Sequence, residues 1–147
     1  MRLSTKGRYG TRAMLELAMR YPKGPTLVKE VARTQEISAK YLDRIFASLK
    51  TGGLVKSVRG AKGGYVLASP PSQIKIGQII QALEGSISPV ECVDDPKFCS
   101  RANLCVTRDL WRKMKELMDS ILNSTTLEGL VEEQKKKNKL HKSMYYI

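Results

Sequence analysis

Apolar residues in the first fifty positions recur at the spacing of an α-helix. Residues 8–20 place apolar side chains mostly three or four apart and end at a Tyr-Pro-Lys-Gly-Pro turn, which predicts one amphipathic helix. A shorter helix is predicted after Thr26, its expected N-cap, and another after Ser38. The apolar stripe of this last helix consists of Tyr41, Leu42, Ile45, Phe46 and Leu49. Two short helices joined by a tight turn predict a helix-turn-helix, whose second helix enters the major groove of DNA; an ordinary helical hairpin is the alternative.

A glycine-rich segment follows the helix-turn-helix. LVKSVRG and GGYVLAS predict two short strands around Gly60-Ala61-Lys62-Gly63-Gly64. A hairpin at this place is typical of a wing, with Arg59 and Lys62 at its tip and glycines that let the backbone approach DNA closely. Arg59 suits a narrow minor groove, whose negative potential attracts arginine. The alternative is a hairpin whose glycines serve only the turn; a nucleotide-phosphate loop is set aside because no GK[ST] ending follows.

The second half of the chain predicts two more helices separated by an irregular loop. IKIGQIIQALEG predicts a helix that ends at Gly85. VTRDLWRKMKELMDSILN predicts a long amphipathic helix whose apolar seam is spaced four, three and four. We expect dimerisation through this helix, because the winged unit is already complete; packing within its own domain is the alternative. The expected dimerisation residues are Leu110, Trp111, Met114, Leu117, Met118 and Ile121.

These elements predict a mainly α fold with a small β-wing: a winged helix-turn-helix plus a long dimerisation helix. We assign 1–85 to the DNA-binding domain and 86–105 to a cysteine loop. Residues 106–131 form the dimerisation helix and a short C-terminal helix, and 132–147 form a basic, mobile tail.

The charge distribution separates two halves of the chain. Residues 1–75 hold 15 Lys/Arg and 4 Asp/Glu, residues 76–134 hold 6 and 10, and residues 135–147 hold 5 and none. The basic first half indicates a nucleic-acid partner, with a solvated basic face as the alternative. We expect a cytoplasmic protein without a membrane contact, because no segment has the apolar length of a membrane span or a signal peptide.

All three cysteines, Cys92, Cys99 and Cys105, lie in one loop. In a reducing compartment this favours a metal, a cluster or redox chemistry over a structural disulfide. Thiolates are the preferred ligands of iron-sulfur clusters, and the loop lacks the closely spaced cysteine pair of structural zinc sites. Zinc, a thiol switch and buried inert cysteines remain alternatives. Catalysis is not expected, because the sole histidine is His141 and no nucleophile has an obvious base.

Four segments together resemble the Rrf2 family of transcription regulators, and most of all its iron-sulfur cluster regulators. They are MRLSTKGRYG, ISAKYLDRIFASLKTGGLVKSVRGAKGGYVLA, IGQIIQALEG and the three-cysteine loop followed by LW. The resemblance covers roughly residues 1–131 and implies a homodimer on a pseudo-palindromic operator in double-stranded DNA. It also implies an iron-sulfur cluster, in the first place [2Fe-2S], held by Cys92, Cys99 and Cys105. The cluster would set DNA affinity or sequence preference and so control genes of cluster biogenesis.

The resemblance also implies the residues that contact DNA. They are Ser38, Lys40, Tyr41, Asp43 and Arg44 on the recognition helix, Arg59, Gly60 and Lys62 on the wing, and Arg2 and Lys6 at phosphates. The chain departs from its likeness at Arg108, where the cluster regulators supply a histidine, because arginine cannot ligate a metal. The fourth ligand is therefore open among Glu91, Asp94, Asp95, Asp109, His141 and an exogenous thiol or hydroxide. The alternative function is a repressor of the same family without a cluster, switched by thiols or zinc or controlled by a partner or small molecule.

Overall fold

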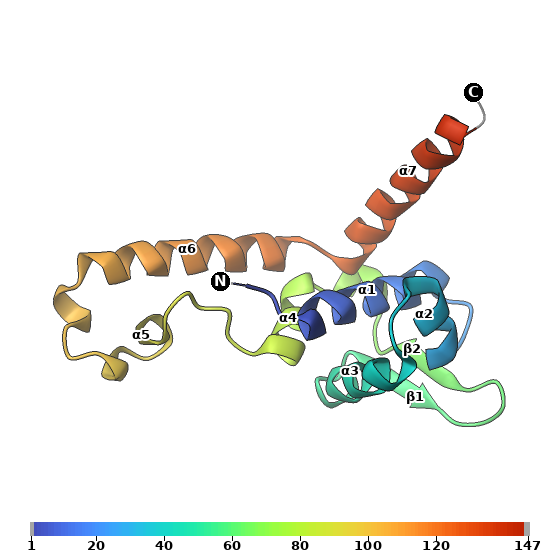
Figure 1. The fold of residues 1–147 in the computed structure, drawn as a ribbon, viewed down its shortest axis with the longest axis horizontal. Coiled ribbons are helices and arrows are strands. Elements are labelled where there is room, and N and C mark those ends of the chain that lie inside the picture. Colours follow the sequence, from blue (N-terminus) through green and yellow to red (C-terminus); the bar gives the residue numbers. More distant parts are fainter. Residues whose placement is uncertain (1, 146–147) are drawn as a thin grey trace.

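The computed structural model describes residues 2–145 as a helical body from which two long helices extend (Figure 1). The main elements are α1 Thr5–Arg20, α2 Val28–Gln35, α3 Ala39–Thr51, β1 Val55–Val58, β2 Gly64–Leu67, α4 Ile76–Glu84, α5 Glu91–Asp94, α6 Val106–Ser124 and α7 Leu127–Tyr145. Short 3-10 turns occur at η1 Pro71–Gln73, η2 Pro96–Phe98 and η3 Ala102–Leu104. The predicted fold class, mainly α with a small β-wing, is confirmed.

The hydrophobic core lies where α1, α3 and α4 pack against one another. Its largest fully buried side chains include Met14 on α1, Phe46 on α3 and Ile79 on α4. The predicted stripe of the recognition helix is buried at Leu42, Ile45, Phe46 and Leu49, whereas Tyr41 is half-buried. Burial of this stripe leaves the opposite face of α3 to solvent.

The helix-turn-helix has one N-cap that we predicted and one that we did not. The Ser38 hydroxyl accepts the backbone N–H of Tyr41 at 3.3 Å and so begins α3 as expected. The prediction that Thr26 caps α2 is wrong. Leu27 occupies the N-cap position, and its side chain makes no capping hydrogen bond. Thr26 is instead 3% exposed and forms an isolated bridge with Tyr65.

This bridge anchors the wing to the helical body. β1 and β2 pair antiparallel from Val55 opposite Leu67 to Val58 opposite Gly64. The Thr26 N–H donates to the Tyr65 carbonyl at 3.0 Å, and the Tyr65 N–H donates back at 2.9 Å. The Tyr65 ring also stacks on Phe46, with ring centroids 4.5 Å apart. The base of the wing is therefore held by both backbone bonds and the core.

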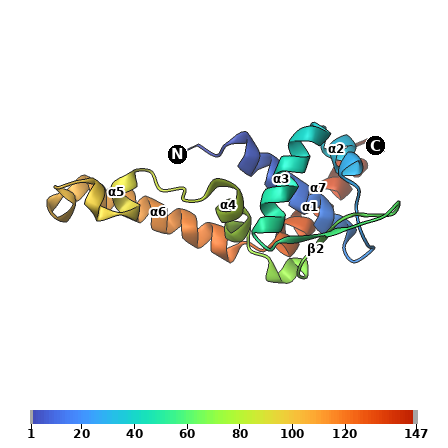
Figure 2. The ribbon, with the colours of Figure 1, turned by 90° about the horizontal axis from the view of Figure 1, so that it is seen from below.

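The two long helices run in different directions. α6 passes over α4 and extends away from the body, with the cysteine loop beneath its far end, whereas α7 leaves on the side away from α3 and the wing (Figures 1 and 2). No helix between residues 2 and 145 is long and apolar enough to cross a membrane.

The last helix is longer than the sequence predicted. We expected a short helix within 106–131 and a mobile tail over 132–147, but α7 runs without a break to Tyr145. The physical reason is that Lys, Glu and Gln are good helix formers, and an ion pair between Lys136 and Glu133 at 3.6 Å spans one helical turn. Residues 146–147 of the expected tail lie outside the described residues.

Candidate DNA-binding surface and cysteine loop

The outer face of α3 gathers the side chains predicted to read bases. Lys40, Asp43 and Arg44 are exposed, and the opposite side of the helix is core. Ser38, Lys40, Tyr41 and Arg44 line a hollow of about 170 Å³ at the start of the helix. The N-terminal end of α3 is therefore free to meet base edges, as a recognition helix must be.

Helix α1 adds two arginines beside the recognition helix. The Tyr9 ring meets the Tyr41 ring edge to face, with centroids 6.0 Å apart. The guanidinium carbons of Arg8 and Arg12 lie 5.7 and 5.5 Å from the centroid of Tyr9. Arg12 also donates to the side-chain and backbone oxygens of Gln35, at the end of α2. Sequence reasoning missed Arg8 and Arg12, although their spacing of four residues places them on one helical face.

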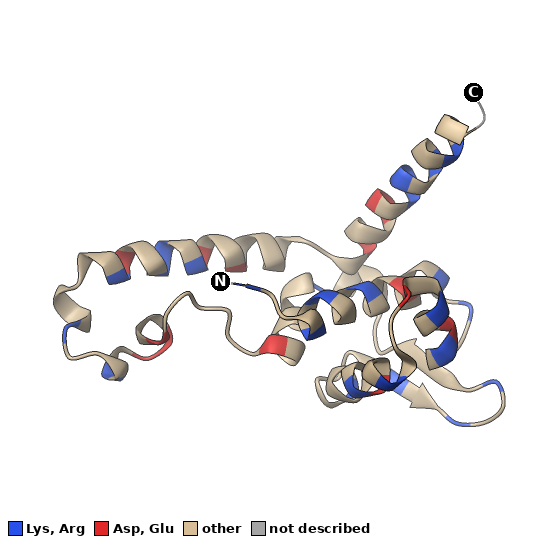
Figure 3. Ribbon diagram, viewed as in Figure 1, with Lys and Arg blue, Asp and Glu red and all other residues tan. Residues whose placement is uncertain are grey.

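The wing tip exposes the other predicted DNA contacts. Arg59, Gly60 and Lys62 are all exposed, and Gly60 has a φ of 115° that favours glycine. Gly63 closes the turn by donating its N–H to the Gly60 carbonyl at 3.0 Å. Figure 3 shows Lys and Arg on α1, α2, α3 and the wing loop, with few acidic residues between them. Of the two predicted phosphate contacts, Arg2 is exposed and Lys6 is half-buried.

The three cysteines lie at different places in the loop over 86–105. Cys92 is half-buried in α5, Cys99 is exposed after η2, and Cys105 is half-buried at the N-cap of α6; all three are free thiols. Between residues 2 and 145, no group of three or more His, Cys, Asp or Glu side chains lies close enough together to hold a metal ion. The predicted ligands are thus chemically suited to a cluster but not arranged to hold one, and the loop would have to refold to bring them together.

Hydrogen bonds fix both ends of this loop. The Asp94 carboxylate accepts the hydroxyls of Ser86 and Ser88, and these bonds, followed by the charge of Lys115, lower the pKa of Asp94. Arg108 donates from Nε to the carbonyl oxygen of Cys92 at 2.8 Å. The residue that replaces the expected histidine therefore ties the start of α6 to the first cysteine.

The candidates for a fourth ligand have other partners or lie elsewhere. Asp95 accepts the backbone N–H of Lys97 at 3.0 Å, and Asp109 pairs with Arg112 at 3.5 Å. Glu91 is exposed beside Cys92. His141 lies on α7, against the ring of Tyr145. The structure brings none of these side chains into a cluster with two of the cysteines.

Cys105 has a distinct environment at the start of α6. Its Sγ lies 3.1 Å from the hydroxyl oxygen of Thr107. A hydrogen bond from Thr107, supported by the backbone N–H of Arg108, lowers the pKa of the Cys105 thiol. The thiolate, which is the nucleophilic and metal-binding form, is thereby favoured at this cysteine.

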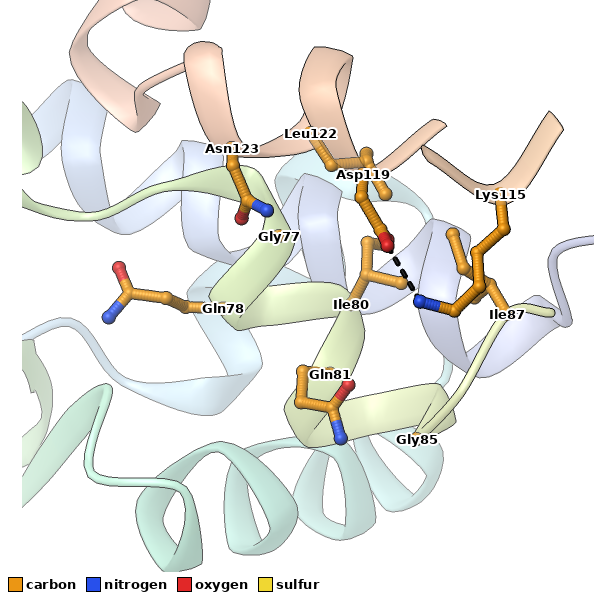
Figure 4. Close-up of a pocket in the computed structure, with 10 residues that line it drawn as sticks. All are labelled: Gly77, Gln78, Ile80, Gln81, Gly85, Ile87, Lys115, Asp119, Leu122 and Asn123. Atoms are coloured by element: carbon orange, nitrogen blue, oxygen red, sulfur yellow. Dashed lines mark hydrogen bonds and ion pairs between the residues drawn. The ribbon is translucent and has the colours of Figure 1, made fainter. Parts of the chain in front are cut away.

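Helix α6 has one face against its own domain and another in solvent. Lys115 and Asp119, paired at 2.7 Å, line a pocket of about 390 Å³ between α6 and α4, together with Ile80, Ile87 and Leu122 (Figure 4). Of the residues predicted for dimerisation, Leu110, Leu117 and Ile121 are 52%, 66% and 65% exposed, and Trp111, Met114 and Met118 are half-buried. The apolar seam is therefore open to a further partner.

The helix-turn-helix, the anchored hairpin beside it and the basic surface that they share define a winged helix-turn-helix DNA-binding protein. Residues 3–133 match the model of the Rrf2 family, described as iron-dependent transcriptional regulators. The chain belongs to the Rrf2 family of transcription regulators.

Named relatives agree in sequence and in structure. The chain is 46% identical to the HTH-type transcriptional regulator CymR of Bacillus subtilis over 130 residues, which cover 88% of this chain and 89% of CymR. It is 40% identical to the regulator IscR of Yersinia pseudotuberculosis over 134 residues, 91% of this chain and 81% of IscR. The solved structure of CymR, described as the global cysteine regulator of B. subtilis, superimposes with a TM-score of 0.77 and covers 90% of this chain and 98% of that one. IscR of T. potens gives a TM-score of 0.75 at 40% identity, with 91% of this chain and 88% of that chain covered.

Proposed function

We propose that this protein is a dimeric transcription regulator that binds a pseudo-palindromic DNA operator and is controlled through its cysteine loop. The observation that carries the proposal is the basic surface of α1, α3 and the wing, in a chain whose cysteines all lie in one separate loop beneath α6. The proposed site of action is the cytoplasm, where thiols stay reduced.

The proposed DNA contacts are of two kinds: some read the base sequence, and others position the protein on the phosphate backbone. Lys40, Asp43 and Arg44 reach base edges in the major groove, and Arg59 enters the adjacent minor groove from the wing. Asp43 accepts from a cytosine amino group and repels phosphate, so it rejects some sequences while permitting others. Arg2 and Lys6 bind phosphates and set the register of the protein without reading sequence.

Dimerisation follows from the open seam of α6. An apolar stripe of this kind is stabilised when a second copy covers it, because each buried leucine is removed from water. Two copies related by a two-fold axis would place their recognition helices at half-sites about one or two turns of DNA apart.

For the signal, we propose an iron-sulfur cluster, in the first place [2Fe-2S], with Cys92, Cys99 and Cys105 as ligands in a refolded loop. The chemistry of three thiols and the likeness to IscR support this proposal. Refolding the loop would break the hydrogen bonds of Asp94 and Arg108, at about 1 kcal/mol each, which the ligand bonds would have to offset. The proposed targets, genes of cluster biogenesis, follow from the same likeness.

The test is an anaerobic absorption spectrum of freshly purified protein, with iron, acid-labile sulfide and zinc counted on the same sample. We expect brown protein that loses its iron and sulfide when the three cysteines are changed to alanine. Colourless protein that also resists reconstitution with iron and sulfide would refute the cluster and leave the DNA-binding proposal in place.

A thiol switch is the second candidate. It is favoured by the lowered pKa of the Cys105 thiol and the exposure of Cys99. It predicts that mild oxidation or alkylation changes the affinity for DNA in colourless protein. Unchanged affinity after complete alkylation would refute it.

A further inference from the structure

A carboxylate from α4 caps the first turn of α1. Glu84 is the last residue of α4, and its Oε1 accepts the backbone N–H of Ser4 at 2.9 Å and that of Gly7 at 3.1 Å. The hydroxyl of Ser4 donates to the same oxygen. The first N–H groups of a helix have no partner within the helix. The Gly7 N–H also donates to the hydroxyl of the N-cap Ser4 at 3.2 Å, so Glu84 reinforces this cap and accepts the Ser4 N–H as well.

Gly7 makes room for this contact, and Gly10 makes room for the neighbouring Leu83. A Cβ at Gly7 would lie 2.3 Å from Oε1 of Glu84, and its three nearest atoms all belong to Glu84. A Cβ at Gly10 would lie 2.1 Å from Cδ1 of Leu83. Glycine inside a helix is less stabilising than alanine, so its presence at Gly7 is explained by the space that the carboxylate needs.

The first turn of α1 also needs the negative charge. It contains no acidic residue and carries Lys6 and Arg8, although the positive end of a helix dipole favours anions. Glu84 supplies from another helix the charge that this turn lacks.

The capped turn lies between the DNA-binding surface and the cysteine loop. Tyr9, two residues after Gly7 on α1, contacts the ring of Tyr41 on the recognition helix. On the other side, Gly85 follows Glu84 with a φ of 73° and leads directly into the loop over 86–105. One side chain therefore joins the start of the loop to the helix that contacts the recognition helix.

We propose that Glu84 is a positioning residue that holds the N-terminal turn of α1 for DNA binding and transmits the state of the cysteine loop to it. This rests on the proposed function, since it assumes an operator and a controlling loop. Displacing Glu84 frees Arg2 and Lys6 from a fixed position, so their phosphate contacts weaken.

The test compares Glu84→Ala with Gly7→Ala, which displaces the carboxylate without removing it. Affinity is measured by fluorescence anisotropy, on DNA selected by the wild-type protein from a random library, over a series of salt concentrations. We expect each variant to bind DNA about tenfold more weakly. The binding constant should also fall less steeply with salt: the slope of its logarithm against log salt should lose about 1 to 2 in magnitude, since each phosphate contact contributes about 0.9. The double variant should bind no more weakly than either single one, because both break the same contact.

Two control variants separate the loss of the Glu84 contact from the general effects of changing a helix glycine or removing a carboxylate. Gly129→Ala makes the same change inside α7, and Glu132→Ala removes an exposed carboxylate from the same helix. Neither should change the affinity or the slope. Two measurements on the free protein show whether only the first turn of α1 has loosened. Hydrogen exchange at Ser4 and Gly7 reports on the turn, and thermal unfolding of each variant reports on the whole domain.

The outcomes distinguish the inference from the proposed function. If Gly7→Ala binds DNA as well as wild type does, as helix propensity alone predicts, Glu84 has no positioning role. If alkylation of the cysteines changes the affinity of the wild type and of Glu84→Ala by the same factor, transmission through Glu84 is refuted while DNA binding stands. If the wild type selects no DNA at all, the proposed function fails and takes this inference with it.

Discussion

Gly64, the first residue of β2, provides a sharp test of how the wing is anchored. Its φ of +135° is a conformation that residues with a side chain rarely adopt, and a Cβ there would lie 2.1 Å from the carbonyl oxygen of Thr26. The obstacle is backbone, which no change of rotamer can move aside. Gly64→Ala should therefore separate Thr26 from Tyr65.

The expected loss of stability can be worked from the contacts involved. The two backbone hydrogen bonds of this bridge, at 3.0 and 2.9 Å, contribute about 1 kcal/mol each. An alanine held at positive φ costs about 1 kcal/mol or more, and weakened stacking of Tyr65 on Phe46 about another 1 kcal/mol. The variant should lose about 4 kcal/mol, a large share of the roughly 5 to 15 kcal/mol that stabilises a typical domain.

Urea unfolding of wild type and variant measures this loss. Gly53→Ala is the matched control, because Gly53 also has a positive φ, +74°, but a Cβ at this position would have no other atom within 4 Å. It should lose only the strain, about 1 to 2 kcal/mol. Binding to DNA should weaken more in Gly64→Ala, since the wing carries Arg59. Equal losses of stability in the two variants would refute the argument that the bridge anchors the wing.

Three further predictions concern DNA, the dimer and the thiols. Arg59→Ala should weaken binding to every good operator by about 1 to 3 kcal/mol in anisotropy titrations, and full affinity would exclude the minor-groove contact. Leu117→Asp should weaken the dimer by about 3 kcal/mol or more in analytical ultracentrifugation, because each copy loses a leucine that the interface would bury and gains a carboxylate in the apolar seam, whereas Lys113→Asp should not. With the other two cysteines replaced by serine, alkylation of Cys105 should begin at lower pH than in Thr107→Val, because the Thr107 hydroxyl lowers the pKa of this thiol and so populates the thiolate earlier. Identical pH profiles would show that Thr107 has no such effect.

Local signals made the DNA-binding half predictable. The stripe of Leu42, Ile45, Phe46 and Leu49 and the cap at Ser38 lie within one helix and its first turn, and the structure shows both as expected. The wing was predictable for the same reason, because strand residues flank a glycine-rich turn. Where a local signal had two meanings, the prediction was wrong: Thr26 is suited to a cap and to a strand, and the lysines of 135–142 are suited to a tail and to a helix.

The sequence by itself determined the helices and strands of the winged unit and the long helix α6, the apolar faces of these helices, and which residues are available for DNA and thiol chemistry. Only the tertiary structure decided that Glu84 caps α1 across 77 to 80 positions of the chain, that Tyr9 meets Tyr41, and that the three cysteines stand apart. The reason is physical. Periodicity, capping and turn chemistry act within a few residues and are written in the order of the chain, whereas contacts between distant residues depend on how whole helices pack, which no short stretch of sequence contains.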